Sequence, residues 1–173
     1  MRNYSQNTQE LVSDLMNGIK VETSALSNLL YMTLGDKTIF NVFGRIKINA
    51  LFGEVVSAAG AQATTLQFKY IQSAPYAIAG ADLTGLSGSL SAKPKGCRVV
   101  CLGGAVATAA LIDAGSGISG YMYPMIVGTN SDSTIAVGAI YIDTGTAANL
   151  TGTTKFVICY VPLSDGAYVT AIA

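Results

Sequence analysis

Hydrophobic and polar residues alternate most clearly near the C-terminus, over residues 154–163. The segment is rich in β-branched and aromatic residues, and its two sets of alternate positions are Lys155, Val157, Cys159 and Val161 against Phe156, Ile158, Tyr160 and Pro162. A period of two residues predicts a strand that is buried on at least one side. The turn-forming residues 164–167 then predict a last short strand over residues 168–172.

The same period recurs earlier in the chain. Residues 38–51 are predicted to form one long strand, with Gly44 as a bulge and with one apolar face made of Phe40, Val42, Ile46 and Ile48. Shorter strands are predicted over residues 64–71, 97–102, 105–112, 121–127 and 134–142. Residues 73–91 are rich in Gly, Ala and Ser and are predicted to be a long loop with at most short strands. Roughly eight to ten short strands predict a mainly β fold, an antiparallel β-sandwich, a jelly-roll-like domain or a small barrel.

The first part of the chain has a helical period instead. Thr8 can cap a helix over residues 8–19, whose apolar face comprises Leu11, Val12, Leu15, Met16 and Ile19. Residues 23–32 carry a second helical pattern. We therefore predict a helical N-terminal arm over residues 1–37 and a β-sandwich domain over residues 38–173. The arm either caps its own domain or docks on a neighbouring subunit. If it docks on a neighbour, the candidate interface residues are Leu11, Leu15, Leu26, Leu29 and Leu30.

The composition is apolar for a soluble monomer. Half of the residues are hydrophobic, the mean hydropathy is +0.45, and 12% are charged, against about 25% in typical domains. A membrane helix is not expected, because the best apolar run, residues 99–112, contains two glycines and falls short of the roughly 20 residues that a span needs. No secretion signal is expected either, because charged residues interrupt the first 25 positions.

Charge is distributed unevenly along the chain. Residues 1–54 hold ten of the 20 charged side chains, and the acids beyond residue 54 are all Asp, mostly beside Gly, Ser or Thr. Such Asp residues are typical of turns. The later strands therefore carry little charge, and the simplest interpretation is that their faces are buried between subunits of a homo-oligomer, a trimer or a dimer. A net charge of +0 gives no electrostatic basis for binding nucleic acid.

Residues able to bind metals are few. The chain has three cysteines and no histidine. Cys97 and Cys101 lie four residues apart in a strand-like segment, and a metal site would need two further ligands. We expect buried free thiols and no metal or cofactor.

Two short motifs match the spacing of known chemical sites. Residues 115–120 match the Gly-x-Gly-x-x-Gly spacing, but the residues that follow cannot open the helix that a dinucleotide site requires, so a loop is predicted. The triplet Asp143-Thr144-Gly145 resembles the aspartic-protease signature, with a weaker echo at Asp113. A turn explains the same composition, and serine or cysteine catalysis would ordinarily need a histidine base. We expect a protein that is not an enzyme.

Several stretches together resemble a family of virion structural proteins of tailed bacteriophages. They are VFGRIKINALFGEV at residues 42–55, TTLQF at 64–68, GAIYI at 138–142 and KFVICYVPLSDGAYV at 155–169. The similarity spans residues 38–173 in its order of strands and loops. The resemblance implies a β-sandwich on the virion surface, commonly a capsid decoration or cement protein and sometimes a fibre or tail component.

The expected function is therefore structural. We expect a decoration or cement subunit that is assembled in the host cytoplasm, resides in the virion, and binds itself and the major capsid protein, without nucleic acid or membrane. The alternative is a fibre, spike or tail component that binds a host-surface receptor or glycan through a shallow aromatic patch. The aromatic residues available for that patch are Tyr76, Tyr121 and Tyr123.

Overall fold

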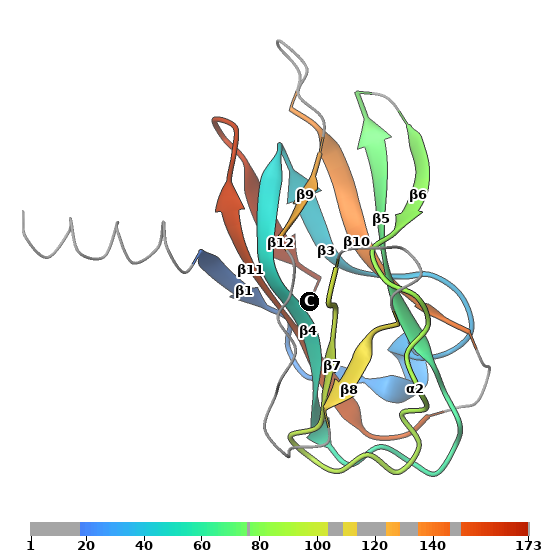
Figure 1. Ribbon diagram of the computed structural model, residues 1–173. Coiled ribbons are helices and arrows are strands. Elements are labelled where there is room, and N and C mark those ends of the chain that lie inside the picture. The colour runs from blue at the N-terminus through green and yellow to red at the C-terminus, as the bar shows by residue number, and fades with distance from the viewer. Residues whose placement is uncertain are drawn as a thin grey trace, which may run out of the picture.

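Two antiparallel β-sheets face each other in the computed structural model, which describes residues 18–75, 77–103, 109–113, 124–128, 135–145 and 150–172 (Figure 1). Sheet A has the order β1 (Ile19–Glu22), β11 (Thr153–Pro162), β4 (Ile46–Ser57), β7 (Arg98–Val100) and β8 (Leu111–Asp113). Two short strands pair with it in addition, β2 (Leu26–Ser27) with β11 and β9 (Met125–Val127) with β4. Sheet B has the order β12 (Tyr168–Ala171), β3 (Lys37–Phe43), β10 (Val137–Thr144), β5 (Leu66–Ala74), β6 (Ile78–Asp82). This arrangement confirms the mainly β prediction and is consistent with a β-sandwich.

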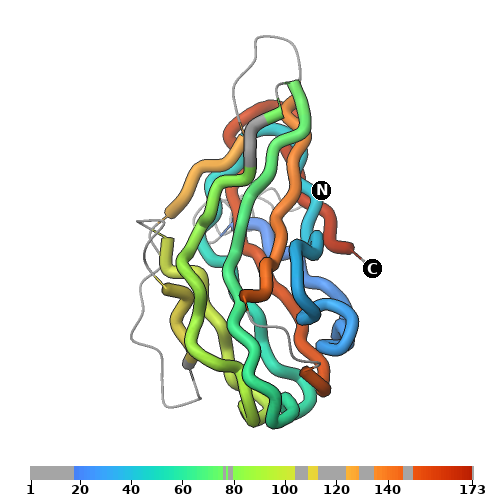
Figure 2. The backbone as a smooth tube through the Cα atoms, turned by 90° about the vertical axis from the view of Figure 1, so that its right-hand side faces the viewer, coloured from blue at the N-terminus to red at the C-terminus, as the bar shows by residue number. Residues whose placement is uncertain are grey.

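The core lies between the sheets and follows from the alternation along each strand. In β11, Phe156 and Ile158 are fully buried, while Lys155 and Cys159 point to the outer face. Phe156 meets Phe68 of sheet B edge-to-face, with ring centroids 6.4 Å apart. Each buried large apolar side chain of this kind contributes about 1.5–3 kcal/mol by leaving water. Figure 2 shows the strands running along the long axis of the molecule.

The predicted single strand over residues 38–51 is wrong. The segment forms two strands in different sheets, β3 in sheet B and β4 in sheet A, joined at Gly44 and Arg45. Gly44 has a φ of +76°, and a Cβ there would lie 2.7 Å from the Cβ of Ala167. The connection therefore needs glycine both for its backbone conformation and for its close approach to the β11–β12 turn.

The predicted helix over residues 23–32 is also wrong in most of its length. A helix is present only as the single turn α2 (Asn28–Tyr31), and β2 precedes it. Thr23 shows why pairing prevails here, because its backbone N–H donates to the Phe156 carbonyl at 2.9 Å and its hydroxyl accepts from the Phe156 N–H at 3.0 Å. Of the other predicted helix, residues 8–17 lie outside the described residues and Ile19 belongs to β1. Residues 19–22 and 26–27 of the predicted arm are thus strands of sheet A.

The remaining short strands were predicted with small errors at their ends. β5, β7, β10 and β12 match their predicted segments. β8 and β9 cover the ends of theirs, while residues 105–108 and 121–123 lie outside the described residues. The predicted loop over residues 73–91 contains β6, which pairs with β5.

Candidate interaction surface

Three exposed leucines lie close together in the chain, on α2 and in the turn that follows it. Leu29, Leu30 and Leu34 are exposed by 45%, 66% and 62%, and we call them the α2 patch. Single exposed leucines are common on protein surfaces, whereas three exposed leucines within six residues concentrate apolar surface on one short segment, as contact sites often do. Two hydrogen bonds fix the start of α2, because the Asn28 backbone N–H donates to the Gly152 carbonyl at 2.9 Å and its side-chain amide donates to the Thr151 carbonyl at 3.0 Å.

The structure separates the candidate interface residues into three groups. Leu29 and Leu30 are at the surface, in the α2 patch. Leu26 is 5% exposed and belongs to the core, because the pairing of β2 with β11 places its side chain there. Leu11 and Leu15 lie outside the described residues. Sequence reasoning missed Leu34, because it comes after the end of the helical pattern. That any of these residues contacts a partner stays a prediction.

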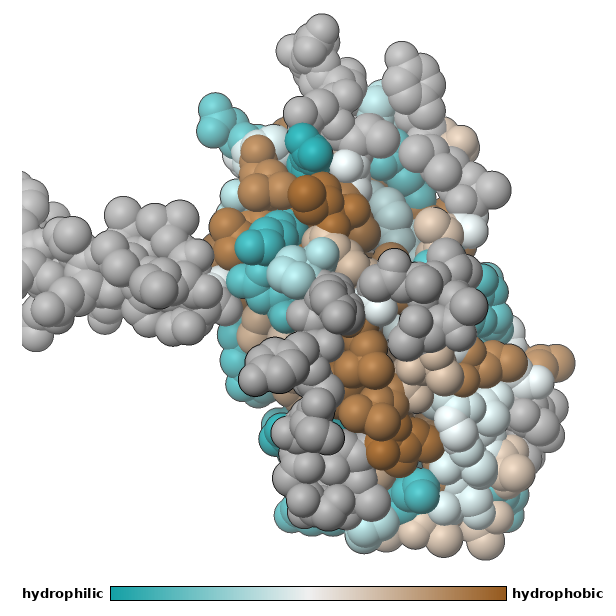
Figure 3. All heavy atoms as spheres, viewed as in Figure 1, coloured by the Kyte–Doolittle hydropathy of each residue, from teal (hydrophilic) through white to brown (hydrophobic). Residues whose placement is uncertain are grey.

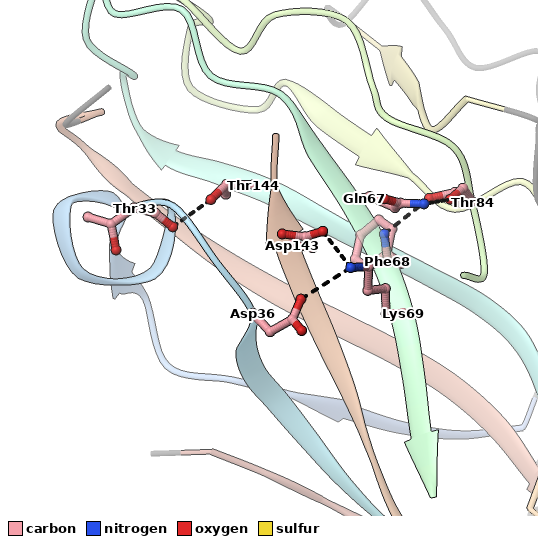
Figure 4. A network of polar contacts seen from close by, with 8 residues as sticks. All are labelled: Thr33, Asp36, Gln67, Phe68, Lys69, Thr84, Asp143 and Thr144. Atoms are coloured by element: carbon pink, nitrogen blue, oxygen red, sulfur yellow. Dashed lines mark hydrogen bonds and ion pairs between the residues drawn. The ribbon is translucent and has the colours of Figure 1, made fainter. Parts of the chain in front are cut away.

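Polar contacts with sheet B hold the turn that carries Leu34 (Figure 4). The Thr144 hydroxyl at the end of β10 donates to the Thr33 carbonyl. Two residues after Leu34, a carboxylate oxygen of Asp36 lies 3.4 Å from the Lys69 Nζ, and an Asp143 oxygen lies 2.5 Å from the same nitrogen. The α2 patch therefore sits on a segment that is tied to two neighbouring strands, β10 and β5, as a preorganised docking surface requires.

The cluster of Lys69, Asp36 and Asp143 has the electrostatics of a structural ion-pair group. The hydrogen-bonded carboxylate of Asp143 raises the pKa of the Lys69 ammonium above its usual value. A lysine that acts as a base or nucleophile needs the opposite shift. Asp143, the candidate from the Asp-Thr-Gly triplet, contacts a cation instead of a second carboxylate, and Asp113 lies on β8 in the other sheet. This arrangement favours the structural interpretation of the triplet.

The outer face of sheet B carries an aromatic pair. Phe43 on β3 and Tyr168 on β12 are directly opposite each other, and their rings stack with centroids 4.5 Å apart. Tyr168 is 46% exposed at the edge of the sheet. Tyr76, Tyr121 and Tyr123, the aromatic residues predicted for a shallow patch, lie outside the described residues. Sequence reasoning missed Phe43 and Tyr168, because only the register of β3 with β12 brings them together.

The outer face of sheet A combines a few charged residues with apolar ones. Glu54 pairs with Arg98, whose Nε lies 3.3 Å from the carboxylate and whose guanidinium covers the Phe52 ring at 5.3 Å. Figure 3 shows hydrophobic atoms gathered over β9 and over β7 and β8. In β9, Ile126 is 55% exposed. This face thus offers apolar surface in addition to the α2 patch.

The thiols are placed as the sequence indicated. Cys97 and Cys101 are buried, and Cys159 is half-buried on the outer face of β11. Burial raises the pKa of the Cys101 thiol to about 12. The motif over residues 115–120 lies outside the described residues. Within the parts of the chain that the structure describes, no three His, Cys, Asp or Glu side chains are grouped so that they could hold a metal ion.

Comparison of the chain with protein-family models, with curated proteins and with solved structures gives no match. None of the helices among the described residues has the length and apolar character needed to cross a membrane.

Proposed function

We propose that this chain is a non-enzymatic structural protein of a bacteriophage virion, a decoration or cement subunit that self-associates as a dimer or trimer and binds the major capsid protein. The observation that carries the proposal is the α2 patch, an exposed apolar area held in place on a sandwich with few charged residues. A jelly-roll-like connectivity and a helical segment before residue 18 belong to the same proposal.

The physical argument is one of area and charge. Apolar burial contributes about 25 cal/mol per Å², so that a contact repeated in many copies becomes strong without ion pairs. Lys69 is paired with Asp36, which is close to the patch in the chain, and with Asp143, so the cluster has one carboxylate more than it has cations. The leucines of the patch carry no charge to be desolvated and gain most from being covered by an apolar partner. The raised pKa of Lys69 and the pairing of Asp143 support a structural role over catalysis.

The first test is the solution mass of the purified chain by light scattering. The proposal predicts two or three times the monomer mass of 17.8 kDa, and a concentration-dependent loss of that mass in the variant Leu30→Asp. Leu163→Asp is the matched control, because Leu163 is 43% exposed and lies beyond the opposite end of β11. A wild-type monomer at all concentrations would contradict self-association.

The second test addresses the shell. Wild-type protein should co-sediment with empty shells of the major capsid protein from the phage that carries this chain, at a fixed number of copies per shell. Absence of co-sedimentation by a well-folded oligomer would argue against a decoration role and in favour of another place in the virion.

The stacked pair of Phe43 and Tyr168 favours a second candidate function. An exposed aromatic ring at a sheet edge can pack against the apolar face of a sugar, so a fibre, spike or tail component that binds a host glycan is the alternative. Glycan-array binding that is lost in Tyr168→Ala and retained in Leu163→Ala would support this alternative.

A further inference from the structure

We infer that the α2 patch receives residues 8–17 of a neighbouring copy of this chain. The inference deepens the proposed function and rests on the self-association in it. It names the occupant of the patch, a short amphipathic segment that precedes β1.

The sequence before β1 offers an amphipathic segment that needs a surface, and the α2 patch is an exposed apolar surface. Residues 8–17 place Leu11, Leu15 and Met16 at helical spacing on one side, with Glu10, Ser13 and Asn17 on the other. A helix of about ten residues is not stable alone in water and needs a surface to pack on. The α2 patch supplies leucines within a single turn and the loop after it, as in complexes where an amphipathic helix lies against an apolar surface.

The reach of the chain excludes the patch of the same molecule. Gly18 lies beside the Tyr160 backbone, because a Cβ on Gly18 would be 2.8 Å from the Tyr160 oxygen, whereas α2 begins beside Gly152. Eight residues of strand separate these two points, a distance of about 26 Å. Figure 1 shows β1 and α2 correspondingly far apart. A helix over residues 8–17 is about 15 Å long, so that its apolar residues cannot lie on the α2 patch of their own copy.

Other exposed apolar residues in the described part of the chain are poorer receivers. Ile126 projects from the three-residue strand β9 opposite Lys47, and Leu163 stands in the turn after β11. Neither has a second exposed leucine within five residues, while the α2 patch has three. Among the described residues, the α2 patch is therefore the segment in which exposed leucines are most concentrated along the chain.

The test is crosslinking between two kinds of copy in the full-length protein. Cys159 is first replaced by Ser, since it is the half-buried thiol, and this background carries either Leu15→Cys with a long tag or Leu30→Cys with a short tag. The two chains are co-expressed and treated with a short bismaleimide. The expected product is a crosslinked species that contains one chain of each length, about tenfold above the control pair, because docking raises the effective concentration of the thiols into the millimolar range.

Two control pairs keep the result specific. Ser13→Cys with Leu30→Cys tests the opposite side of the segment, and Leu15→Cys with Leu163→Cys tests an exposed leucine elsewhere on the molecule. An oligomer without enrichment over these controls would overturn the inference and leave the proposed function standing. A doubly substituted chain that crosslinks only within itself would also overturn it. A monomer by light scattering would overturn both.

Discussion

The backbone N–H of Val169 donates a hydrogen bond to the Tyr160 hydroxyl across 3.1 Å, and both residues are buried. Val169 lies in β12, the edge strand of sheet B, and Tyr160 in β11 of sheet A. The contact joins the two sheets and occupies a donor at an edge where a foreign strand could otherwise pair.

Replacing Tyr160 with Phe should reduce the free energy of unfolding by about 1–3 kcal/mol, because the Val169 N–H would be left buried without an acceptor. Denaturant unfolding of wild type and variant measures the difference. Tyr168→Phe is the control, and as an exposed hydroxyl substitution it should stay within about 0.5 kcal/mol of wild type. Equal stability of all three proteins would show that the hydrogen bond contributes nothing.

Gly44→Ala should destabilise the protein by more than a substitution at another glycine with positive φ. The new Cβ would meet the Cβ of Ala167 at 2.7 Å in addition to the strain of a φ of +76°. At Gly96, φ is +87° and nothing lies within 4 Å of the added atom. We expect about 1 kcal/mol for Gly96→Ala and about 2–4 kcal/mol for Gly44→Ala, compared by thermal unfolding. Similar values would mean that the turn can shift away from β12.

The ion pairs of Lys69 should make stability depend on alkaline pH. In the folded state the Asp143 carboxylate raises the pKa of Lys69 above the ordinary lysine value of 10.5. The contribution of the ion pairs to stability is therefore present below pH 10.5 and is lost as the pH rises through the higher folded pKa. Wild type should exceed Lys69→Met by about 1 kcal/mol at pH 7, and the difference should shrink above pH 10.5. Lys95→Met, at an exposed turn position, controls for the charge change. A difference that stays constant to pH 12 would contradict the linkage.

Thiol modification should proceed in two stages. At pH 8 the half-buried Cys159 should react first, although burial raises its pKa and slows it relative to a free thiol. Cys101, with a pKa raised to about 12, should react only after unfolding. Iodoacetamide labelling followed by peptide mass spectrometry measures both stages, and Cys159→Ser should remove the first. Labelling of Cys101 at the rate of Cys159 would show that the core opens locally.

The sequence predicted best the strands that have a paired strand on each side in their sheet, such as β11 and β10. The error at residues 38–51 has a physical cause. Phe40 and Val42 point into the core from sheet B, and Ile46 and Ile48 point into the same core from sheet A, all with 0% exposure. The alternation therefore continues through Gly44 although the chain changes sheets, and periodicity alone cannot reveal the crossing.

The α2 patch was half predictable. Helical spacing correctly singled out Leu29 and Leu30 as apolar positions, but the exposure of a leucine depends on which strand covers it. Leu26 is covered because β2 pairs with β11, a contact between residues far apart in the sequence. Leu34 lies in a turn that is held on sheet B by the Thr33 backbone carbonyl, which accepts from Thr144, and by the Asp36 carboxylate, which pairs with Lys69. Neither relationship leaves a local signal.

The pairing of β11 also sets the order of events during synthesis. β11 lies between β1 and β2 on one side and β4 on the other, yet it is translated after nearly all of the chain. Sheet A therefore cannot close before residue 162 has been made, and until then the edges of β1, β2 and β4 that face β11 stay unpaired. Such long-range closure is slow, on the order of milliseconds to seconds. The N-terminal strands β1 and β2 thus gain their place in the sheet only through a partner strand about 130 residues later in the chain.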